Sequence, residues 1–118
     1  MDNQISVTRD IAASPEAVWA LVADLERMGE WSPENQGGNW VTPATEAAVG
    51  AVFKGSNSND KRTWTTKVKV LEFDSPHRFS FRLLAGRLGS CDWVYALEPS
   101  ELGCLVTESW VDQRTPLL

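Results

Sequence analysis

The fold of this chain is decided by the stretch Ile11-Ala-Ala-Ser-Pro-Glu-Ala-Val-Trp-Ala-Leu-Val-Ala-Asp-Leu-Glu-Arg-Met-Gly-Glu-Trp31. Ser14 is a favourable N-cap, and Pro15 suits the first helical position because its missing N–H would have no helical partner there. The apolar residues that follow recur at helical spacing and form one stripe: Val18, Leu21, Val22, Leu25 and Met28. We therefore predict a capped helix whose stripe packs on the end of a sheet.

A second short helical piece is expected from Asp24 to Met28, ended by Gly29. Residues 31–38 contain Pro, Asn and Gly and predict a loop. Most of the remaining chain alternates between apolar and polar residues, which predicts seven strands, over residues 4–11, 39–42, 51–57, 62–73, 78–84, 91–97 and 104–112. Alternation fails at residues 71–73, which predicts a bulge or a local twist. Short turns imply an antiparallel meander, so the predicted class is α+β, a seven-stranded antiparallel sheet with two short helices after the first strand.

Length and charge limit the possible partners. The 118 residues predict one domain over residues 1–118. The net charge is −5, and the eleven basic residues are scattered along the chain with no run longer than Lys61-Arg62. That pattern argues against nucleic acid or an anionic membrane as the main partner, since both need clustered basic residues. No apolar stretch is long enough for membrane insertion and no signal pattern begins the chain, so a cytoplasmic protein is predicted.

The two cysteines are expected to remain free thiols. Cys91 and Cys104 fall on neighbouring strands of a hairpin that turns at residues 100–103. In that register Cys91 lies near Asp112, several residues away from Cys104, which is too far for a disulfide. The single histidine and the two cysteines show no metal-ligand spacing, so no metal and no cofactor are expected.

Strand parity places a set of aromatic residues on one face of the sheet: Phe53, Trp64, Phe79, Phe81, Trp93, Tyr95 and Trp110. They either line a pocket for a flat or hydrophobic small molecule or simply pack the core. The parity of the last strand is ambiguous. We expect the face with Val106, Glu108 and Trp110 to point inward, which would place Glu108 among the aromatic side chains.

Polar residues on the same predicted face have two interpretations. Asn57, Arg62, Tyr95 and Glu108, together with Arg9, would orient a ligand or take part in proton transfer. Alternatively, Glu108 forms a structural ion pair with Arg9 or Arg62, because a buried charge needs a partner.

Two further tryptophans, Trp31 and Trp40, flank the predicted loop. They either gate the mouth of a cavity or cap the core.

A series of motifs resembles the START-like superfamily, within it the polyketide cyclase/dehydrase-like (SRPBCC) branch. The motifs are Ile-x-Ala-Ser-Pro-Glu-x-Val-Trp, Asp-Leu-x-x-Met-x-x-Trp, Phe-x-Gly-x-Asn, Trp, Phe-x-Phe, Trp-x-Tyr and Val-Thr-Glu-x-Trp, in that order along nearly the whole chain. The resemblance implies a helix-grip fold, in which the sheet wraps a long C-terminal helix around an internal cavity. Here the chain ends where that helix would begin, so the C-terminal helix is expected to be absent or truncated. An open apolar face favours association, so a homo-oligomer or a domain-swapped dimer is expected.

The resemblance implies binding of a hydrophobic or aromatic small molecule, lipid or polyketide-like, in an internal cavity. The candidate binding residues are Trp31, Trp40, Phe53, Asn57, Arg62, Trp64, Phe79, Phe81, Trp93, Tyr95, Glu108 and Trp110. One alternative is a polyketide aromatase/cyclase or dehydratase, for which no catalytic residue is assigned. Another is a non-catalytic interaction module whose open groove accepts a partner helix. Whether the protein is an enzyme stays open.

Overall fold

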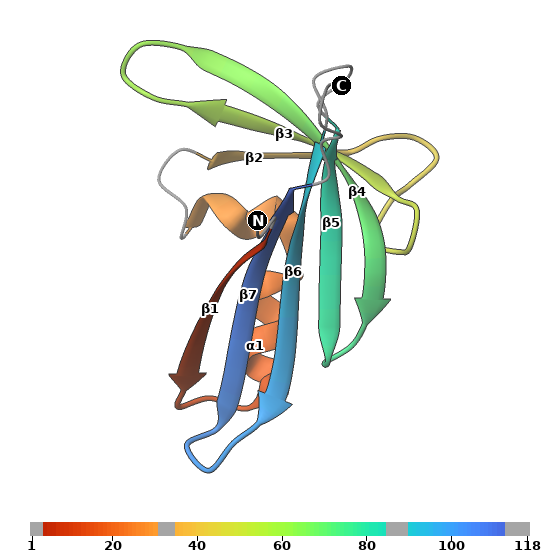
Figure 1. The fold of residues 1–118 in the computed structure, drawn as a ribbon. Helices are drawn as coiled ribbons and strands as arrows, with labels where there is room; N and C mark the ends of the chain where they lie inside the picture. The colour runs from red at the N-terminus through yellow and green to blue at the C-terminus, as the bar shows by residue number, and fades with distance from the viewer. Residues whose placement is uncertain (1–3, 31–34, 85–89, 113–118) are drawn as a thin grey trace, which may run out of the picture.

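The computed structural model describes residues 4–30, 35–84 and 90–112, which form a strongly curved antiparallel sheet with helical elements on its concave side (Figure 1). The spatial order is β1-β7-β6-β5-β4-β3-β2. The elements are β1 (Gln4–Ile11), α1 (Pro15–Val22), the 3₁₀ helix η1 (Leu25–Glu30), β2 (Asn35–Trp40), β3 (Val52–Ser58), β4 (Thr63–Asp74), β5 (Arg78–Leu84), β6 (Ser90–Pro99) and β7 (Cys104–Asp112). The predicted α+β class is confirmed.

Several local predictions are confirmed and one is wrong. β1 and β7 have the predicted bounds, and the register between β4 and β5 shifts between Val70 and Glu72, which is the predicted bulge. The loop predicted over residues 31–38 is wrong from residue 35 onward, because Asn35 and Gly38 already pair with Asn57 and Gly55 of β3. Glycine is unfavourable for strand formation in general, so only the pairing partner reveals this strand.

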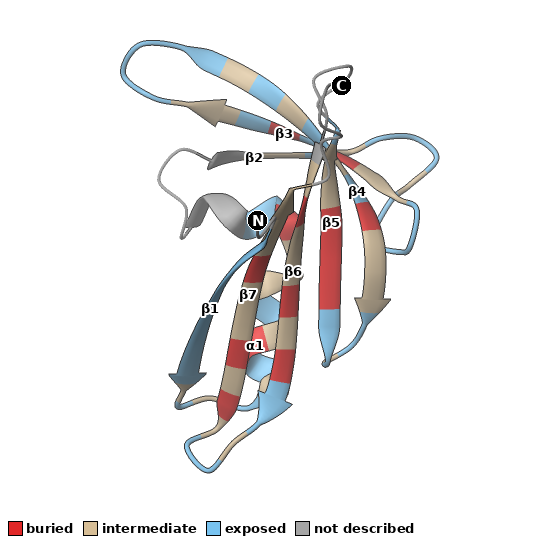
Figure 2. Cartoon of the chain, viewed as in Figure 1, coloured by how far each residue is buried: buried red, intermediate tan, exposed pale blue. Residues whose placement is uncertain are grey.

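The first helix begins as predicted but packs differently. The Ser14 hydroxyl accepts a hydrogen bond from the Ala17 amide at 3.1 Å. Val18 is buried, whereas Leu21 is 55% exposed, so the prediction that the whole stripe packs on the sheet is wrong at Leu21. Instead Trp19 meets Phe73 and Phe79 edge-on, with ring centroids 5.3 and 6.0 Å apart. Figure 2 shows exposed and intermediate positions along α1 around its buried residue, which is Val18.

Cross-strand pairing settles which residues share the concave face. Tyr95 lies opposite Phe79 on one side and opposite Glu108 on the other. Glu108 in turn lies opposite Val7. Because directly paired residues point to the same side of a sheet, the Glu108 and Trp110 face of β7 points inward, as predicted.

The predicted register of the last hairpin is also confirmed. Cys91 pairs with Asp112, and Glu98 pairs with Leu105. Cys91 and Cys104 are free thiols.

The core lies on the concave side, around Phe79. This ring is fully buried and contacts four other aromatic rings, those of Trp19, Phe73, Phe81 and Tyr95. Leu97, Cys104 and Val106 continue the buried cluster towards β7.

The convex face of the sheet carries side-chain hydrogen bonds between neighbouring strands. The buried Ser80 hydroxyl donates to Glu72 Oε1 at 2.9 Å, and Arg78 Nε donates to Glu72 Oε2 at 2.6 Å. Arg82 binds the buried Asp92 with two hydrogen bonds, of 2.7 and 3.0 Å. In the part of the chain that the structure describes, every buried side-chain nitrogen and oxygen has a partner, so the buried polar groups of this face are all satisfied within the protein.

Candidate ligand-binding site on the concave face

An open pocket of about 450 Å³ lies on the concave face, along β1, β7 and β6. It is lined by Ile5, Val7, Trp93, Glu108 and Trp110. Trp93 and Trp110 are direct cross-strand partners, so the two indoles project from neighbouring strands. Ile5 and Val7 are 64% and 50% exposed and form the outer rim on the edge strand. The pocket therefore combines aliphatic and aromatic walls with one carboxylate.

The two indoles of this pocket lie at the margin of the core, against which Trp93 packs. Both Trp93 and Trp110 are half-buried, and within the described residues neither makes a ring contact or a side-chain hydrogen bond. Phe79, Phe81 and Tyr95, by contrast, are buried and pack on one another. The pocket indoles therefore keep surface for a ligand, because no aromatic ring among the described residues packs on them.

Glu108 lies directly opposite Tyr95 on the neighbouring strand. Burial of Tyr95 raises the pKa of its phenol well above the usual value, and the hydrogen bond to Glu108 and the negative charge of that carboxylate raise the pKa further. Tyr95 stays a hydrogen-bond donor, and a carboxylate has about four acceptor positions on its two oxygens. Glu108 can therefore accept from Tyr95 and from a second donor at the same time.

Tyr95 is the only tyrosine of the chain, so its titration can be followed directly. In the folded protein we expect no phenolate absorbance until the pH lies well above about 10, where an unfolded tyrosine titrates. Because the folded pKa is the higher one, the unfolded state loses its proton first, so stability falls as the pH rises above that value. Ultraviolet difference absorbance measures both states, with and without urea.

The variant Glu108→Gln removes the neighbouring negative charge and is expected to lower the folded pKa of Tyr95 without abolishing the shift, since burial is its largest cause. A native phenol that titrates together with the urea-unfolded chain would contradict this account.

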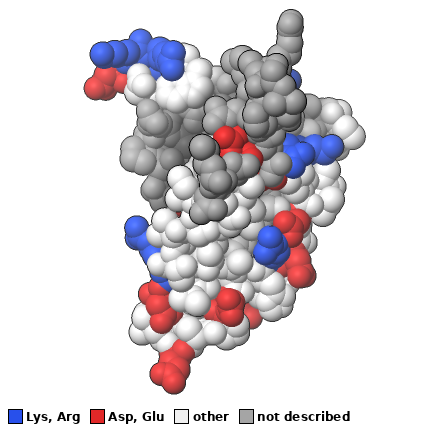
Figure 3. All heavy atoms as spheres, in the orientation of Figure 1, with Lys and Arg blue, Asp and Glu red and all other residues white. Residues whose placement is uncertain are grey.

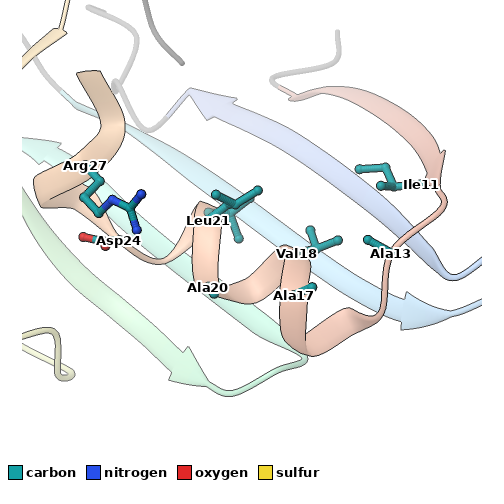
Figure 4. Close-up of a pocket in the computed structure, with 9 residues that line it drawn as sticks. Ile11, Ala13, Ala17, Val18, Ala20, Leu21, Asp24 and Arg27 are labelled. Carbon is teal, nitrogen blue, oxygen red and sulfur yellow. The ribbon is translucent and has the colours of Figure 1, made fainter. Parts of the chain in front are cut away.

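A second pocket of about 450 Å³ lies between α1 and the end of β1 (Figure 4). Its lining is almost entirely apolar: Ile11, Ala13, Ala17, Val18, Ala20, Leu21 and Val22, with Asp24 and Arg27 at the η1 end. None of the twelve predicted site residues lines it. Val18 and Leu21 belong to the apolar stripe that the sequence identifies, but the sequence analysis predicts that the whole stripe packs on the sheet and leaves no pocket beside it.

The predicted aromatic residues divide between core and pocket. Phe53, Phe79 and Phe81 are buried among other core residues. Trp40 packs edge-on against Phe53 at 5.1 Å, and its indole nitrogen donates to Glu26 of η1 at 2.8 Å. Trp40 therefore joins β2 to η1 over the end of the core. Trp31 lies outside the described residues.

The three predicted residues near the β3–β4 turn lie away from the Glu108 pocket lining. Asn57 donates to Thr66 Oγ1 at 3.3 Å, and Trp64 is half-buried. Arg62 is exposed in the turn before β4, with its guanidinium carbon 5.4 Å from the centroid of the Trp64 ring. Arg62 therefore lies on the side of Trp64, as predicted, but it is exposed, because β4 begins one residue later, at Thr63.

The alternative interpretation, in which Glu108 forms a structural ion pair with Arg9 or Arg62, is wrong. Arg9 is exposed on the edge strand, and among the described residues neither Arg9 nor Arg62 forms an ion pair with Glu108. The sequence analysis missed Ile5 and Val7 as pocket residues, although they share strand parity with Arg9, which it assigned to the inward face.

No group of three or more metal-ligating side chains occurs within the described ranges. Likewise, no helix there is long and apolar enough to cross a bilayer.

The curved seven-stranded sheet with helices on its concave side is a helix-grip fold. Residues 3–117 match the family model described as polyketide cyclase / dehydrase and lipid transport, and the chain belongs to that family. Among curated proteins, none matches the chain.

Solved structures repeat the fold. The polyketide-cyclase-like protein Cgl2372 of Corynebacterium glutamicum is 34% identical, with a TM-score of 0.69 over 96% of this chain and 67% of that one. Ginseng major latex-like protein 151 of Panax ginseng is 17% identical, with a TM-score of 0.77 over 96% and 80% of the two chains. Ara h 8.0201 is 15% identical, with a TM-score of 0.78 over 98% and 81%. The last two identities show the fold alone.

Proposed function

We propose that the protein binds an apolar small molecule on its concave face, in the pocket lined by Trp93, Trp110 and Glu108. The observation that carries this proposal is the combination of two half-buried indoles, side by side on neighbouring strands, with a carboxylate that has no cationic partner among the described residues. Ligand pockets are typically apolar and aromatic with a few polar groups that fix orientation. The family description, which includes lipid transport, supports the same class of function.

The chemistry of the pocket narrows the ligand class. Glu108 can only accept hydrogen bonds while it is ionised, and indole faces attract cations. The proposed ligand therefore has an apolar body and a donor or cationic head, such as a hydroxyl or an ammonium group. An anionic head would face Glu108 without compensation.

Three probes with one apolar chain test this proposal: dodecylammonium, dodecan-1-ol and dodecanoate, each titrated below its micelle concentration while tryptophan fluorescence is recorded. Binding of the alcohol tests the apolar site itself. We expect the ammonium to bind about tenfold or more tighter than the carboxylate, since hydrogen bonds to charged groups contribute about 1.5–3 kcal/mol.

The variant Glu108→Gln should remove the preference for ammonium while keeping the alcohol bound. Glu98→Gln is the matched control, because it makes the same charge change at an exposed residue of β6. No saturable change with any of the three probes would contradict the proposed function. Equal loss of preference in both variants would contradict the role of Glu108.

A second candidate, a cyclase or dehydratase, is favoured by the contact between Tyr95 and Glu108. A phenol kept protonated beside a carboxylate offers a donor and a base for aldol-type proton transfers. Turnover of a poly-β-keto substrate that falls in both Tyr95→Phe and Glu108→Gln would support it.

Self-association and a cytoplasmic location stay predictions. The exposed apolar residues Ile5, Val7 and Leu21 and the groove beside α1 support self-association or docking of a partner helix. A monodisperse monomer in sedimentation would contradict self-association.

A further inference from the structure

The basic residues of this acidic protein are concentrated on one hairpin. All four lysines of the chain, Lys54, Lys61, Lys67 and Lys69, lie on β3, β4 or their turn, together with Arg62. Residues 51–70 contain only one acidic residue, Asp60, so this segment has a net charge of +4. Because the whole chain carries −5, the remainder carries −9. The sequence showed no long basic run, but the hairpin brings these residues together.

Strand pairing places three of the lysines on the same side of the hairpin. Lys54 lies directly opposite Lys67, and Lys69 follows two residues along β4 on the same side. This side is the convex one, since Phe53 and Val68 occupy the concave side between them. Like charges directly opposite each other destabilise a sheet. A purely structural role therefore does not explain why lysines occupy both positions.

As far as Lys69, the rest of this convex side carries hydroxyl groups and Val52. The next carboxylate on it along β4, Glu72, is already bound by Ser80 and Arg78. Ser56 pairs with Thr65, and Ser58 pairs with Thr63, next to the lysine positions. All three lysines are exposed, and within the described part of the chain none forms an ion pair. Ammonium and hydroxyl groups are donors that suit phosphate and carboxylate oxygens. We name this side of β3 and β4 the lysine face.

The hairpin is also accessible to a large partner. In Figure 1 the β3–β4 hairpin extends beyond the rest of the sheet, and Figure 3 shows Lys and Arg gathered at its tip beside a single acidic group. At the opposite end of the molecule acidic groups predominate in this view. This separation of charge would orient the protein in the field of a negatively charged surface.

We propose that the lysine face docks the protein on an anionic lipid bilayer, without insertion. A bilayer surface is broad and flat, as is the side of a two-stranded hairpin, and its negative potential attracts Lys and Arg. Nucleic acid is less favoured, because the lysine face has no aromatic residue on which bases could stack. The proposal rests on the proposed function in one respect: docking would bring the concave pocket close to apolar ligands that reside in the bilayer.

Vesicle flotation at about 0.15 M salt tests docking, with vesicles of phosphatidylcholine alone or with roughly 30% phosphatidylserine. We expect binding only to the anionic vesicles. The triple variant Lys54→Gln/Lys67→Gln/Lys69→Gln should weaken it by on the order of 100-fold, since each lysine near such a surface contributes about fivefold. Salt at about 1 M, which shortens the Debye length to about 3 Å, should release the protein.

Two controls separate the lysine face from total charge. Lys54→Arg/Lys67→Arg/Lys69→Arg keeps the charge and should keep binding. Lys67→Gln should weaken binding more than Arg9→Gln, which makes the same charge change on the exposed edge strand. Equal effects of these two single variants, or no preference for anionic vesicles, would overturn the proposal. Salt-sensitive binding to duplex DNA without vesicle binding would overturn it in favour of nucleic acid.

The same triple glutamine variant separates this proposal from the proposed function. Its affinity for dodecan-1-ol in solution should be unchanged, because the lysines lie on the side of the sheet away from the pocket. Loss of vesicle binding with normal alcohol binding supports docking. If the wild type binds vesicles but not the alcohol, the proposed function of the pocket is contradicted and the docking proposal is not.

Discussion

Replacing Phe79 by alanine is expected to lower the free energy of unfolding by about 4 kcal/mol. Phe79 has no exposed surface and lies at the centre of the aromatic cluster. Its ring contacts Trp19 of α1 as well as Phe81 and Tyr95 of the sheet. Truncation would therefore open a cavity between helix and sheet that rigid neighbouring rings can only partly fill.

Urea unfolding, followed by tryptophan fluorescence, measures this loss of stability. Two other alanine variants provide the comparison. Phe73→Ala should cost less, because Phe73 is half-buried and, among the described residues, has ring contacts with Trp19 and Phe79 alone. Leu102→Ala, at a residue 57% exposed in the last turn, should cost little. If Phe79→Ala were no more destabilising than Leu102→Ala, α1 would not be packed as described.

Replacing Gly38 by alanine is expected to lower the free energy of unfolding by about 3 kcal/mol. A Cβ atom at this position would lie 2.2 Å from the Lys54 carbonyl oxygen, and 2.9 Å from Gly55 Cα and from Phe53 Cε1. Two of these three atoms belong to the backbone of β3, so β2 would have to move away from its partner strand. That movement would also loosen the contact of Trp40 with Phe53.

The matched control is the glycine directly across the sheet. Gly55 pairs with Gly38, but a Cβ at Gly55 would come no closer than 3.4 Å to another residue, the Thr66 hydroxyl. Gly55→Ala should therefore be tolerated far better. Thermal and urea unfolding of the two variants measure the difference, and similar stabilities would refute the close approach of β2 to β3.

Much of the fold was predictable because it depends on short-range rules. Ser14 and Pro15 begin the helix through the geometry of its own first turn. The tight turns at residues 75–77 and 100–103 leave the adjoining strands no arrangement other than antiparallel pairing. The register of the β6–β7 hairpin follows from its turn, which is why the separation of Cys91 and Cys104 was predicted correctly.

Other features depend on partners that lie far away in the sequence. β2 contains Gly37 and Gly38, which weaken any local strand signal, and it forms because β3 offers backbone partners and a close approach. Trp19 rather than Leu21 packs on the sheet, since the direction in which α1 faces Phe79 is set by how helix and sheet dock. Helical spacing identifies a stripe but does not indicate which neighbour covers it.

The candidate site also combines features that local rules predict with features that depend on distant partners. Residues with the same parity along a strand share a face, so Phe79, Phe81, Trp93, Tyr95 and Trp110 were assigned correctly to one side of the sheet. The sequence alone did not separate the core rings from the two indoles of the pocket. That separation depends on α1, which packs on the sheet at Phe79.

By itself the sequence determined the capped helix, the meander of strands and the face that each side chain occupies, because these follow from backbone geometry within a few residues. Only the tertiary structure decided which inward residues are covered by other side chains. It also decided that the neighbour of Glu108 is Tyr95 and not an arginine. Finally, it brought four lysines that are separated along the chain together on one hairpin. The physical reason is that burial and charge clustering are properties of neighbours in space, and chain folding chooses those neighbours.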